Sequence, residues 1–255
     1  MDLGTIIGIV MAIAAILGGQ ALEGGHASSL MQLTAGIIIL GGTLGATMVS
    51  FPMNELKRAA SLAKLGFGNQ HHDVRATVKE IVELAAIARR DGVLALESKL
   101  GAVTDEFLKR ALQLLVDGVD ATVARTMLET AIEVEYEEGA AGGKVYESAG
   151  AFAPAVGILG AVLGLIHVME NLSNPDALGP GIAVAFVATV YGVGIANLLL
   201  LPLGSKIKRK LIHERERKTV IAEGVLGIQD GLNPRVLEEK LNAYAGLKPE
   251  AAAAK

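Results

Sequence analysis

The chain has 255 residues but no cysteine and no tryptophan. Without cysteine it has no disulfide framework, no thiolate nucleophile and no thiolate metal ligand. Aromatic residues make up only 4% of the chain, so the belt of Trp and Tyr that often marks the interfaces of a membrane protein is missing. The net charge is only −4, which argues against a basic nucleic-acid binder, and we expect no nucleic-acid partner.

Lysine and arginine are also missing from long parts of the chain. All 23 basic residues fall within 57–144 and 206–255. Two apolar runs, 3–22 and 30–51, precede the first block, and two more lie within 149–203. Runs of roughly two dozen residues cross a hydrocarbon core of ~30 Å as helices. The sequence therefore predicts an all-α, polytopic membrane protein with four transmembrane helices and a cytoplasmic helical subdomain. Four buried core helices of a soluble protein are the alternative, but soluble helices of this length are normally amphipathic.

The distribution of charge also predicts the orientation. Lys and Arg are retained on the cytoplasmic side, so both basic blocks and both termini should lie in the cytoplasm. We expect a multi-pass membrane protein. The predicted layout is residues 1–54 (transmembrane helices 1 and 2), 55–148 (a cytoplasmic helical domain), 149–204 (transmembrane helices 3 and 4) and 205–255 (C-terminal cytoplasmic helices and tail).

The polar stretch between the two pairs of spans has helical periodicity. It predicts helices near residues 56–65, 74–90, 105–117 and 123–138. In the last of these, Met127, Leu128, Ile132 and Tyr136 should point inward. The run 139–143, with three glycines and two alanines, is expected to end that helix before the third span. A short helix over 235–244 is expected after Asn233-Pro234.

Pairs of glycines four residues apart occur in three spans: Gly4/Gly8, Gly41/Gly45 and Gly160/Gly164. Such small-residue faces let helix backbones approach closely in lipid. We expect them to support packing within the chain and contacts between subunits.

The spans have no Asp, Glu, Lys or Arg near the middle of the membrane, and Thr189 is the clearest polar side chain at depth. His167 and Glu170 lie near the outer end of the third span, where an interfacial pair is more common than a proton relay. A protein that carries its own ion site usually has an ionisable residue at depth. If this chain handles an ion, we expect the titrating group to belong to another chain.

Three segments resemble the MotA family of flagellar stator subunits. Residues 152–165 (FAPAVGILGAVLGL) resemble the third family span, and residues 181–192 (GIAVAFVATVYG) resemble the fourth. Residues 89–97 (RRDGVLALE) are similar to the family's cytoplasmic motif of Arg and Glu around a glycine turn. The resemblance covers nearly the whole chain, and residues 167–172 (HVMENL) look most like the branch sometimes named MotC.

The resemblance implies an ion-channel-forming stator subunit of the bacterial inner membrane that drives flagellar rotation and so supports motility and chemotaxis. It implies a homopentamer around a dimer of MotB-type subunits, which supply the ion-binding Asp. Pro154 and Pro202 match two family prolines, which implies a role in coupling; simple kinks would fit the same local chemistry. Arg89 and Glu97 match residues that contact the rotor protein FliG, and Arg90 lies beside them.

The resemblance assigns the ion pathway to Thr189 and to the position of Ala161. Sodium-type relatives carry Thr where this chain has Ala161, and a methyl group offers no oxygen ligand for Na⁺. Thr189 matches a threonine that does not discriminate between the two ions. We therefore expect proton coupling, with a sodium-coupled stator as the alternative.

The sequence leaves other classes open. These are an ExbB/TolQ-like energiser, a ZorA-like motor of a defence system, and a structural membrane scaffold without ion flow. An enzyme is disfavoured, because the chain has no Walker A motif and no nucleophile–His pairing. We expect no cofactor and no metal site, with His71-His72 in a solvent-exposed loop.

Overall fold

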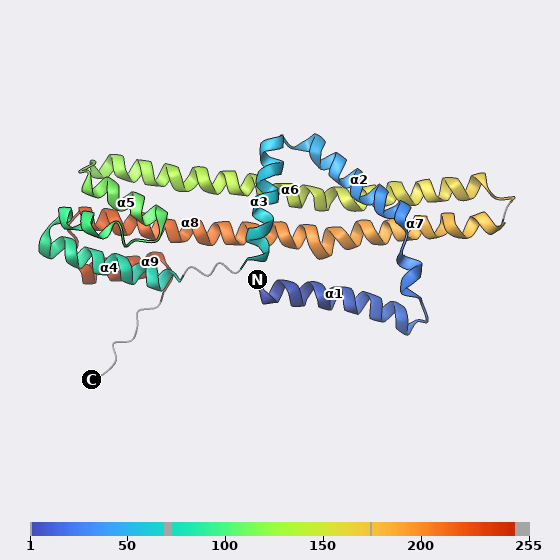
Figure 1. Cartoon of the computed structure of the whole chain (residues 1–255), viewed down its shortest axis with the longest axis horizontal. Helices are drawn as coiled ribbons and strands as arrows, with labels where there is room; N and C mark the ends of the chain where they lie inside the picture. The colour runs from blue at the N-terminus through green and yellow to red at the C-terminus, as the bar shows by residue number, and fades with distance from the viewer. Residues whose placement is uncertain (1, 69–72, 174, 248–255) are drawn as a thin grey trace. The chain divides into compact units, whose positions relative to one another are not determined.

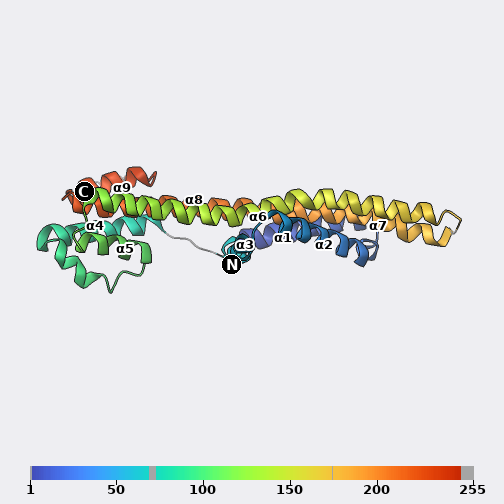
Figure 2. The ribbon, with the colours of Figure 1, turned by 90° about the horizontal axis from the view of Figure 1, so that it is seen from above.

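The computed structural model describes residues 2–68, 73–173 and 175–247, and these form two compact units. The first unit consists of Met1–Asn69 and Gly139–Lys210, and the second of Gln70–Glu138 and Leu211–Lys255. Figures 1 and 2 show the helices from two directions. His71-His72 lies outside the described residues. The elements are α1 (Leu3–Leu22), η1 (Ala27–Leu30), α2 (Leu33–Ser50), α3 (Met53–Phe67), α4 (Val74–Asp91), η2 (Val93–Lys99), α5 (Glu106–Val116), α6 (Ala121–Glu170), α7 (Pro175–Ile195), η3 (Ala196–Leu200), α8 (Leu201–Gln229) and α9 (Pro234–Tyr244).

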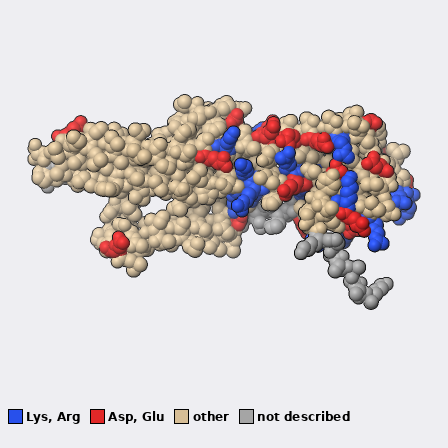
Figure 3. All heavy atoms as spheres, turned by 180° about the vertical axis from the view of Figure 1, so that it is seen from behind, with Lys and Arg blue, Asp and Glu red and all other residues tan. Residues whose placement is uncertain are grey.

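The first unit contains the apolar helices. Among the described residues, four helical segments are long and apolar enough to cross a membrane: Leu3–Leu22, Ala27–Ser50, Ala121–Glu170 and Leu178–Gln229. The prediction of an all-helical, four-span protein is confirmed. On the face drawn in Figure 3, a long part of the surface carries no blue side chain. That surface is suited to acyl chains rather than to water.

Helix α3 follows the second span and differs from it in pattern. Its apolar residues lie on one side of the helix, and the basic residues Lys57, Arg58 and Lys64 occur between them in the sequence. In Figures 1 and 2, α3 runs across the direction of α6 and α8. The hydroxyl of Tyr146 in α6 donates to the Ala59 carbonyl of α3 over 2.7 Å. An amphipathic helix crossing the spans at a basic end is suited to the membrane interface.

The expected helix end at residues 139–143 is wrong, because α6 runs unbroken from Ala121 to Glu170. Glycine costs a helix about 1 kcal/mol relative to alanine, but here its small size permits close packing. A Cβ on Gly142 would lie 2.7 Å from Leu62 Cδ1 of α3, and one on Gly143 would lie 3.6 Å from Ile207 Cγ2 of α8. These glycines allow neighbouring helices to approach α6 and do not terminate it.

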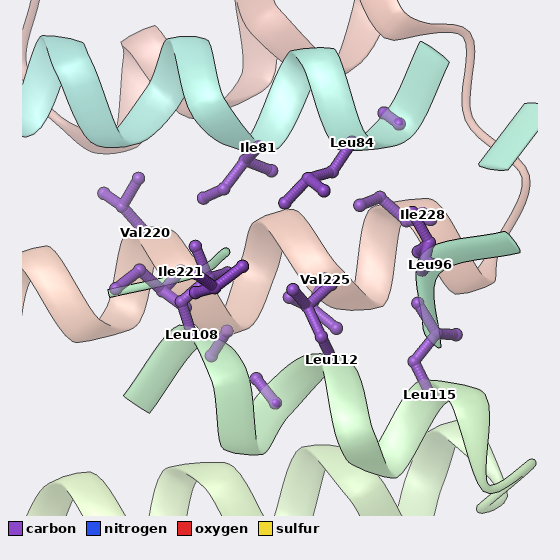
Figure 4. Close-up of a cluster of buried hydrophobic side chains, with 14 of the residues drawn as sticks. Ile81, Leu84, Leu96, Leu108, Leu112, Leu115, Val220, Ile221, Val225 and Ile228 are labelled. Atoms are coloured by element: carbon purple, nitrogen blue, oxygen red, sulfur yellow. The ribbon is translucent and has the colours of Figure 1, made fainter. Parts of the chain in front are cut away.

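The second unit is built around a conventional aliphatic core. Side chains from α4, η2, α5 and α8 meet in it, as Figure 4 shows, and burying each large one contributes roughly 1.5–3 kcal/mol. They include Ile81, Leu84, Leu96, Leu108, Leu112, Leu115, Val220, Ile221, Val225 and Ile228.

Helix α6 contributes Leu128 and Ile132 to this core, and Ala124, four residues before Leu128, is buried on the same stripe. The predicted inward positions of Leu128 and Ile132 are confirmed, and Tyr136 is half-buried. Met127 is 41% exposed, contrary to expectation. It lies about 100° from Leu128 around the helix and so falls outside the stripe.

Helix ends follow the capping chemistry of the sequence. Asp105 Oδ1 accepts a hydrogen bond from Leu108 N at the start of α5 (2.8 Å), and Asp120 Oδ1 accepts one from Thr122 N at the start of α6 (2.9 Å). Gly118 between them has φ of 70°, a value that favours glycine. The predicted C-terminal helix is confirmed as α9, where Asn233 accepts from Arg235 N over 3.0 Å.

Candidate functional site: the open face of α6 and α7 and the α4–η2 turn

Helices α6 and α7 pack unusually closely because small residues line their contact. A Cβ on Gly164 of α6 would lie 2.8 Å from Ala185 N of α7, and one on Gly160 would lie 2.8 Å from Ala188 Cβ. Glycine at these positions brings two backbones into contact, as small-residue faces do in lipid. The predicted Gly160/Gly164 face is therefore used within the chain.

The other two predicted glycine faces have no such neighbour in the described chain. A Cβ on Gly8, Gly41 or Gly45 would meet no atom within 4 Å, and one on Gly4 would meet only Asp2. These faces are open in the single chain.

Helix α2 covers one side of the α6–α7 pair. Its Ala35 and Ile39 form a buried cluster with Val187 and Ala188 of α7. A Cβ on Gly42 would lie 2.6 Å from Val156 Cγ1 of α6. Val156 and Val187 each precede a residue of the α6–α7 contact by one position, Gly157 and Ala188 respectively. Both valines therefore lie on the side of the pair that α2 covers.

The opposite side carries the predicted ion-pathway residues. Ala161 follows Gly160 by one position, and Thr189 follows Ala188 by one. Each residue further along a helix is rotated by about 100° about the helix axis. Because α6 and α7 run antiparallel, the residue that follows a contact residue lies on the same side of the pair in both helices. Pro154, six residues before Gly160, falls on that side too. We name Pro154, Ala161, Ile182 and Thr189 the open face.

The open face is largely apolar and only partly covered. Thr189 and Ile182 are exposed, while Ala161 and Pro154 are half-buried. Phe186 and Ile158, which border it, are 70% and 62% exposed. An apolar surface of this kind marks a contact site for protein or lipid.

Thr189 has a hydroxyl that is only loosely engaged. It donates to Ala185 O, one turn back in α7, over 3.3 Å. A hydroxyl that donates weakly to its own helix keeps its acceptor lone pairs available. Thr189 is therefore suited to bind a water molecule or a protonated carboxyl group placed against the open face.

His167 and Glu170 do not form a bonded pair in the structure. Asn171 Nδ2 instead donates to the His167 carbonyl oxygen over 2.8 Å and lies 3.5 Å from the ring nitrogen Nδ1. His167 is exposed at the end of α6. The structure therefore gives no support to a relay between His167 and Glu170.

The two predicted coupling prolines lie in different surroundings. Pro154 lies within unbroken α6 and on the open face. Pro202 follows the wider π-helical turn η3, Ala196–Leu200, and faces a groove beside α1. Proline has no N–H and crowds the carbonyl four residues earlier, and local π geometry accommodates this in a helix. The prolines do not share one surface.

The predicted rotor motif forms an exposed turn at the end of α4. Gly92 has φ of 86°, a conformation that side-chain-bearing residues rarely adopt, and it separates α4 from η2. Leu96 is fully buried in the core of the second unit and holds η2 in place. Arg89, Arg90 and Glu97 are all exposed around this anchored turn.

The three charges differ in their engagement. Arg90 donates to both carboxylate oxygens of Asp91, with Nη2 to Oδ2 at 2.8 Å. These hydrogen bonds lower the pKa of Asp91 and raise that of Arg90. Arg89 and Glu97 have no ion-pair partner within the described part of the chain. The motif therefore presents one internally neutralised arginine and two charges that remain available.

A network of ion pairs inside the second unit could not be predicted from the sequence. Arg217 of α8 is 5% exposed and contacts Asp105 at 2.6 Å and Glu214 at 2.7 Å. Glu223 of α8 contacts Arg125 of α6 at 2.5 Å and Lys240 of α9 at 2.7 Å. These pairs attach α8 to α5, α6 and α9. The basic stretch of α8, whose charges alone would suggest exposure to water, is therefore partly buried.

The neighbours of Asp105 stabilise its ionised form. Burial opposes its ionisation, but the hydrogen bonds from Leu108 N and from Arg217 outweigh burial and keep the pKa of Asp105 below its usual value. Among the described residues no cluster of His, Asp or Glu is arranged to hold a metal ion.

Fold and site together define a polytopic helical membrane protein with an acid-free, two-helix face and a separate charged turn. Residues 100–219 match the MotA/TolQ/ExbB proton channel family, and residues 6–92 match the Motility protein A N-terminal family. The chain belongs to the MotA/TolQ/ExbB family, as a stator-type ion-channel subunit of the inner membrane rather than an enzyme.

Full-length relatives agree with this assignment. Motility protein A of Helicobacter pylori is 41% identical over 246 residues, covering 96% of this chain and 95% of the relative. The structure of C. jejuni MotAB matches with a TM-score of 0.92 and 34% identity over 100% of this chain and 99% of that one. The flagellar MotAB stator complex from Bacillus subtilis matches with a TM-score of 0.86 and 37% identity over 94% of each chain.

Proposed function

We propose that this chain is the MotA-type stator subunit of a bacterial flagellar motor and couples proton flow to torque on the rotor. The observation that carries the proposal is the open face of α6 and α7. Ala161 and Thr189 lie on the same side of this helix pair, on a partly covered apolar surface that has no ionisable group of its own. Such a surface becomes an ion path only when a partner supplies the titrating group.

The partner in this proposal is a MotB-type dimer whose transmembrane helices carry an Asp. The similar solved structures are described as MotAB complexes, which supports this choice. The partner helix lies against the exposed Ile158 and Phe186, with its Asp near Thr189. Copies of this chain surround the dimer as a homopentamer, using the Gly41/Gly45 face of α2, which is open in the single chain.

The proposed orientation follows the basic residues. Both termini, residues 55–148 and residues 205–255 lie in the cytoplasm, while residues 1–54 and 149–204 contain the four spans. Each proton that crosses yields about 2.3 kcal/mol per 100 mV of membrane potential. Protonation removes the charge of the partner Asp and with it the cost of holding that charge against an apolar face. The preferred fit between partner helix and open face therefore alternates with protonation.

Torque leaves the membrane through the α4–η2 turn. Arg89 and Glu97 carry opposite charges on a turn that Leu96 anchors to the core, which suits repeated contact with a charged rotor surface of FliG. Pro154 borders the ion path and Pro202 follows the π-helical turn, so each is placed to transmit a small change of helix geometry. We assign both a coupling role.

The experiment is complementation of a strain that lacks its own stator, with this chain and its MotB-type partner expressed together. Swimming should be restored and should stop when a protonophore is added. Charge reversal, Arg89→Glu or Glu97→Lys, should abolish swimming at normal membrane levels of the protein, and a compensating reversal on FliG should restore it. Normal swimming of both reversed variants at low and high load would contradict the rotor assignment.

A further inference from the structure

A groove of about 350 Å³ runs beside α1 in the first unit. It lies between α1, the π-helical turn η3 and the start of α8. Its lining is apolar except for Thr5, Asn197 and, at one end, Lys206. Water is an unfavourable occupant of a groove with this apolar lining on the membrane-spanning part of a protein.

Helix α1 is attached to its neighbours mainly at its first turn. Asp2 N donates to Phe67 O of α3 over 2.9 Å, and the Asp2 carboxylate pairs with Lys206. Lys206 also donates to the Thr5 hydroxyl. Beyond this turn α1 has no buried residue, and a Cβ on Gly8 would meet nothing within 4 Å. The groove is therefore closed by polar contacts at its Lys206 end and uncovered along α1.

A second cation lies at the same end and is not engaged. Pro202, Lys206 and Arg209 are spaced i, i+4, i+7, so they share one face of α8. Arg209 is exposed and has no ion-pair partner in the part of the chain that the structure describes. The next residue, Lys210, is occupied, because it donates to Leu65 O over 2.7 Å at the end of α3.

The acid at this end is already compensated. Asp2 is held by Lys206 and also accepts from Gly4 N at the start of α1. At this end α8 thus presents one paired lysine and, three residues further on, a guanidinium that has no ion-pair partner among the described residues. A guanidinium binds phosphate oxygens in a bidentate manner, and basic pockets between spans bind anionic lipid headgroups.

We propose that this groove binds one acyl chain of an anionic phospholipid of the cytoplasmic leaflet, with the lipid phosphate on Arg209 and Lys206. The leaflet follows from the orientation proposed above. The apolar lining accommodates the chain, and the unpaired guanidinium selects an anionic headgroup over a zwitterionic one.

Two pairs of matched variants test the proposal. Gly8→Leu fills the groove, whereas Gly18→Leu places the same side chain on α1 at a second position with nothing within 4 Å and outside the groove lining. Arg209→Gln removes the free cation, whereas Lys208→Gln removes an adjacent exposed cation that lies on another side of α8.

The measurement is native mass spectrometry of the complex with its MotB-type partner, titrated with phosphatidylglycerol or phosphatidylcholine. We expect tighter retention of phosphatidylglycerol, and a loss of roughly tenfold in its affinity for Gly8→Leu and for Arg209→Gln. Gly18→Leu and Lys208→Gln should bind as the unaltered chain does. If Gly8→Leu fails to assemble, the surface variant Arg209→Gln still decides.

Equal retention of the two lipids, or variants that bind like their controls, would overturn the lipid site. So would a cross-link from Gly8→Cys to another copy of this chain, which would show a neighbouring subunit in the groove. The outcome is separable from the stator proposal, because complementation of swimming by the unaltered chain does not depend on which molecule fills the groove.

Discussion

Gly192 of α7 lies so close to Ala153 of α6 that a Cβ on the glycine would be 2.6 Å from the Ala153 carbonyl oxygen. The neighbouring atom belongs to the backbone and not to a side chain that could change its rotamer. The contact between Gly192 and the Ala153 backbone thus limits how close the two helices can lie at this point. Ala161 and Thr189 each follow a contact residue by one position, so the distance between the two helices also determines the distance between these two residues of the open face.

A side chain at Gly192 should therefore separate the helices. For Gly192→Val we expect destabilisation of about 1–3 kcal/mol and loss of swimming, because overpacking against a backbone cannot be relieved by rotamer change. Gly194→Val, on the same helix, is the control, since a Cβ on Gly194 meets nothing within 4 Å. Thermal stability of the purified complex and swimming speed are measured together. Equal behaviour of the two variants would refute close packing at Gly192.

The two adjacent arginines of the α4–η2 turn should not be equivalent. Arg89→Gln removes a charge that has no ion-pair partner in the described chain, so we expect a marked loss of torque. The double variant Arg90→Gln, Asp91→Asn removes an internal pair without changing net charge, so it should swim nearly normally. The measurement is rotation speed of tethered cells under load, with membrane levels checked by immunoblot. If the double variant is as impaired as Arg89→Gln, the distinction drawn from the Arg90–Asp91 pair is wrong.

Removing the charge of Asp105 should destabilise the second unit. Asp105→Asn keeps the N-cap, because Asn caps helices as well as Asp, but leaves the buried Arg217 with one acid partner fewer. Breaking a buried pair of this kind costs about 3 kcal/mol. Asp117→Asn is the control, since Asp117 is exposed at the other end of α5 and, among the described residues, its side chain bonds only to Gln113. Urea denaturation of the full complex compares the two.

The same carboxylate gives a pH dependence. The pKa of Asp105 is lower in the folded chain than its ordinary value. Its contribution to stability is therefore complete above the unfolded pKa and is lost as the pH falls through the folded pKa. The stability difference between the unaltered chain and Asp105→Asn should shrink on acidification through that range. A difference that stays constant there would contradict the Asp105–Arg217 assignment.

Much of the fold follows from local sequence signals. The four apolar runs predict the spans, and the caps at Asp105 and Asn233 and the turn at Gly92 lie where polar and glycine residues indicate them. The prediction that residues 139–143 end a helix was wrong because glycine can have two structural roles. It can end a helix, or it can admit a neighbour, and only the positions of Leu62 and Ile207 distinguish these uses.

The site was less predictable than the fold. The motif pointed to Ala161 and Thr189 by resemblance, but their common side depends on which residues of α6 and α7 meet, and that is a tertiary property. Likewise the ion pairs Arg217–Asp105 and Glu223–Arg125 join residues about a hundred positions apart. Charged residues at helical spacing read as a solvated face until partners on other helices are placed.

The side chains of the open face favour protons over sodium as the coupling ion. Sodium in proteins is held by several oxygens, whereas proton transfer needs a carboxyl group and a water path. On the open face Ala161 offers a methyl group and Thr189 offers a single hydroxyl, which already donates weakly to Ala185 O. We expect swimming speed to be insensitive to external Na⁺ at fixed pH and membrane potential, and to collapse with a protonophore. Thr189→Ala should slow swimming, and Thr189→Ser should retain most of the speed because it keeps the hydroxyl. Ala161→Thr adds one oxygen, too few to complete a sodium shell, so it should not create Na⁺ dependence. A speed that rises with Na⁺ in the unaltered chain would refute proton coupling.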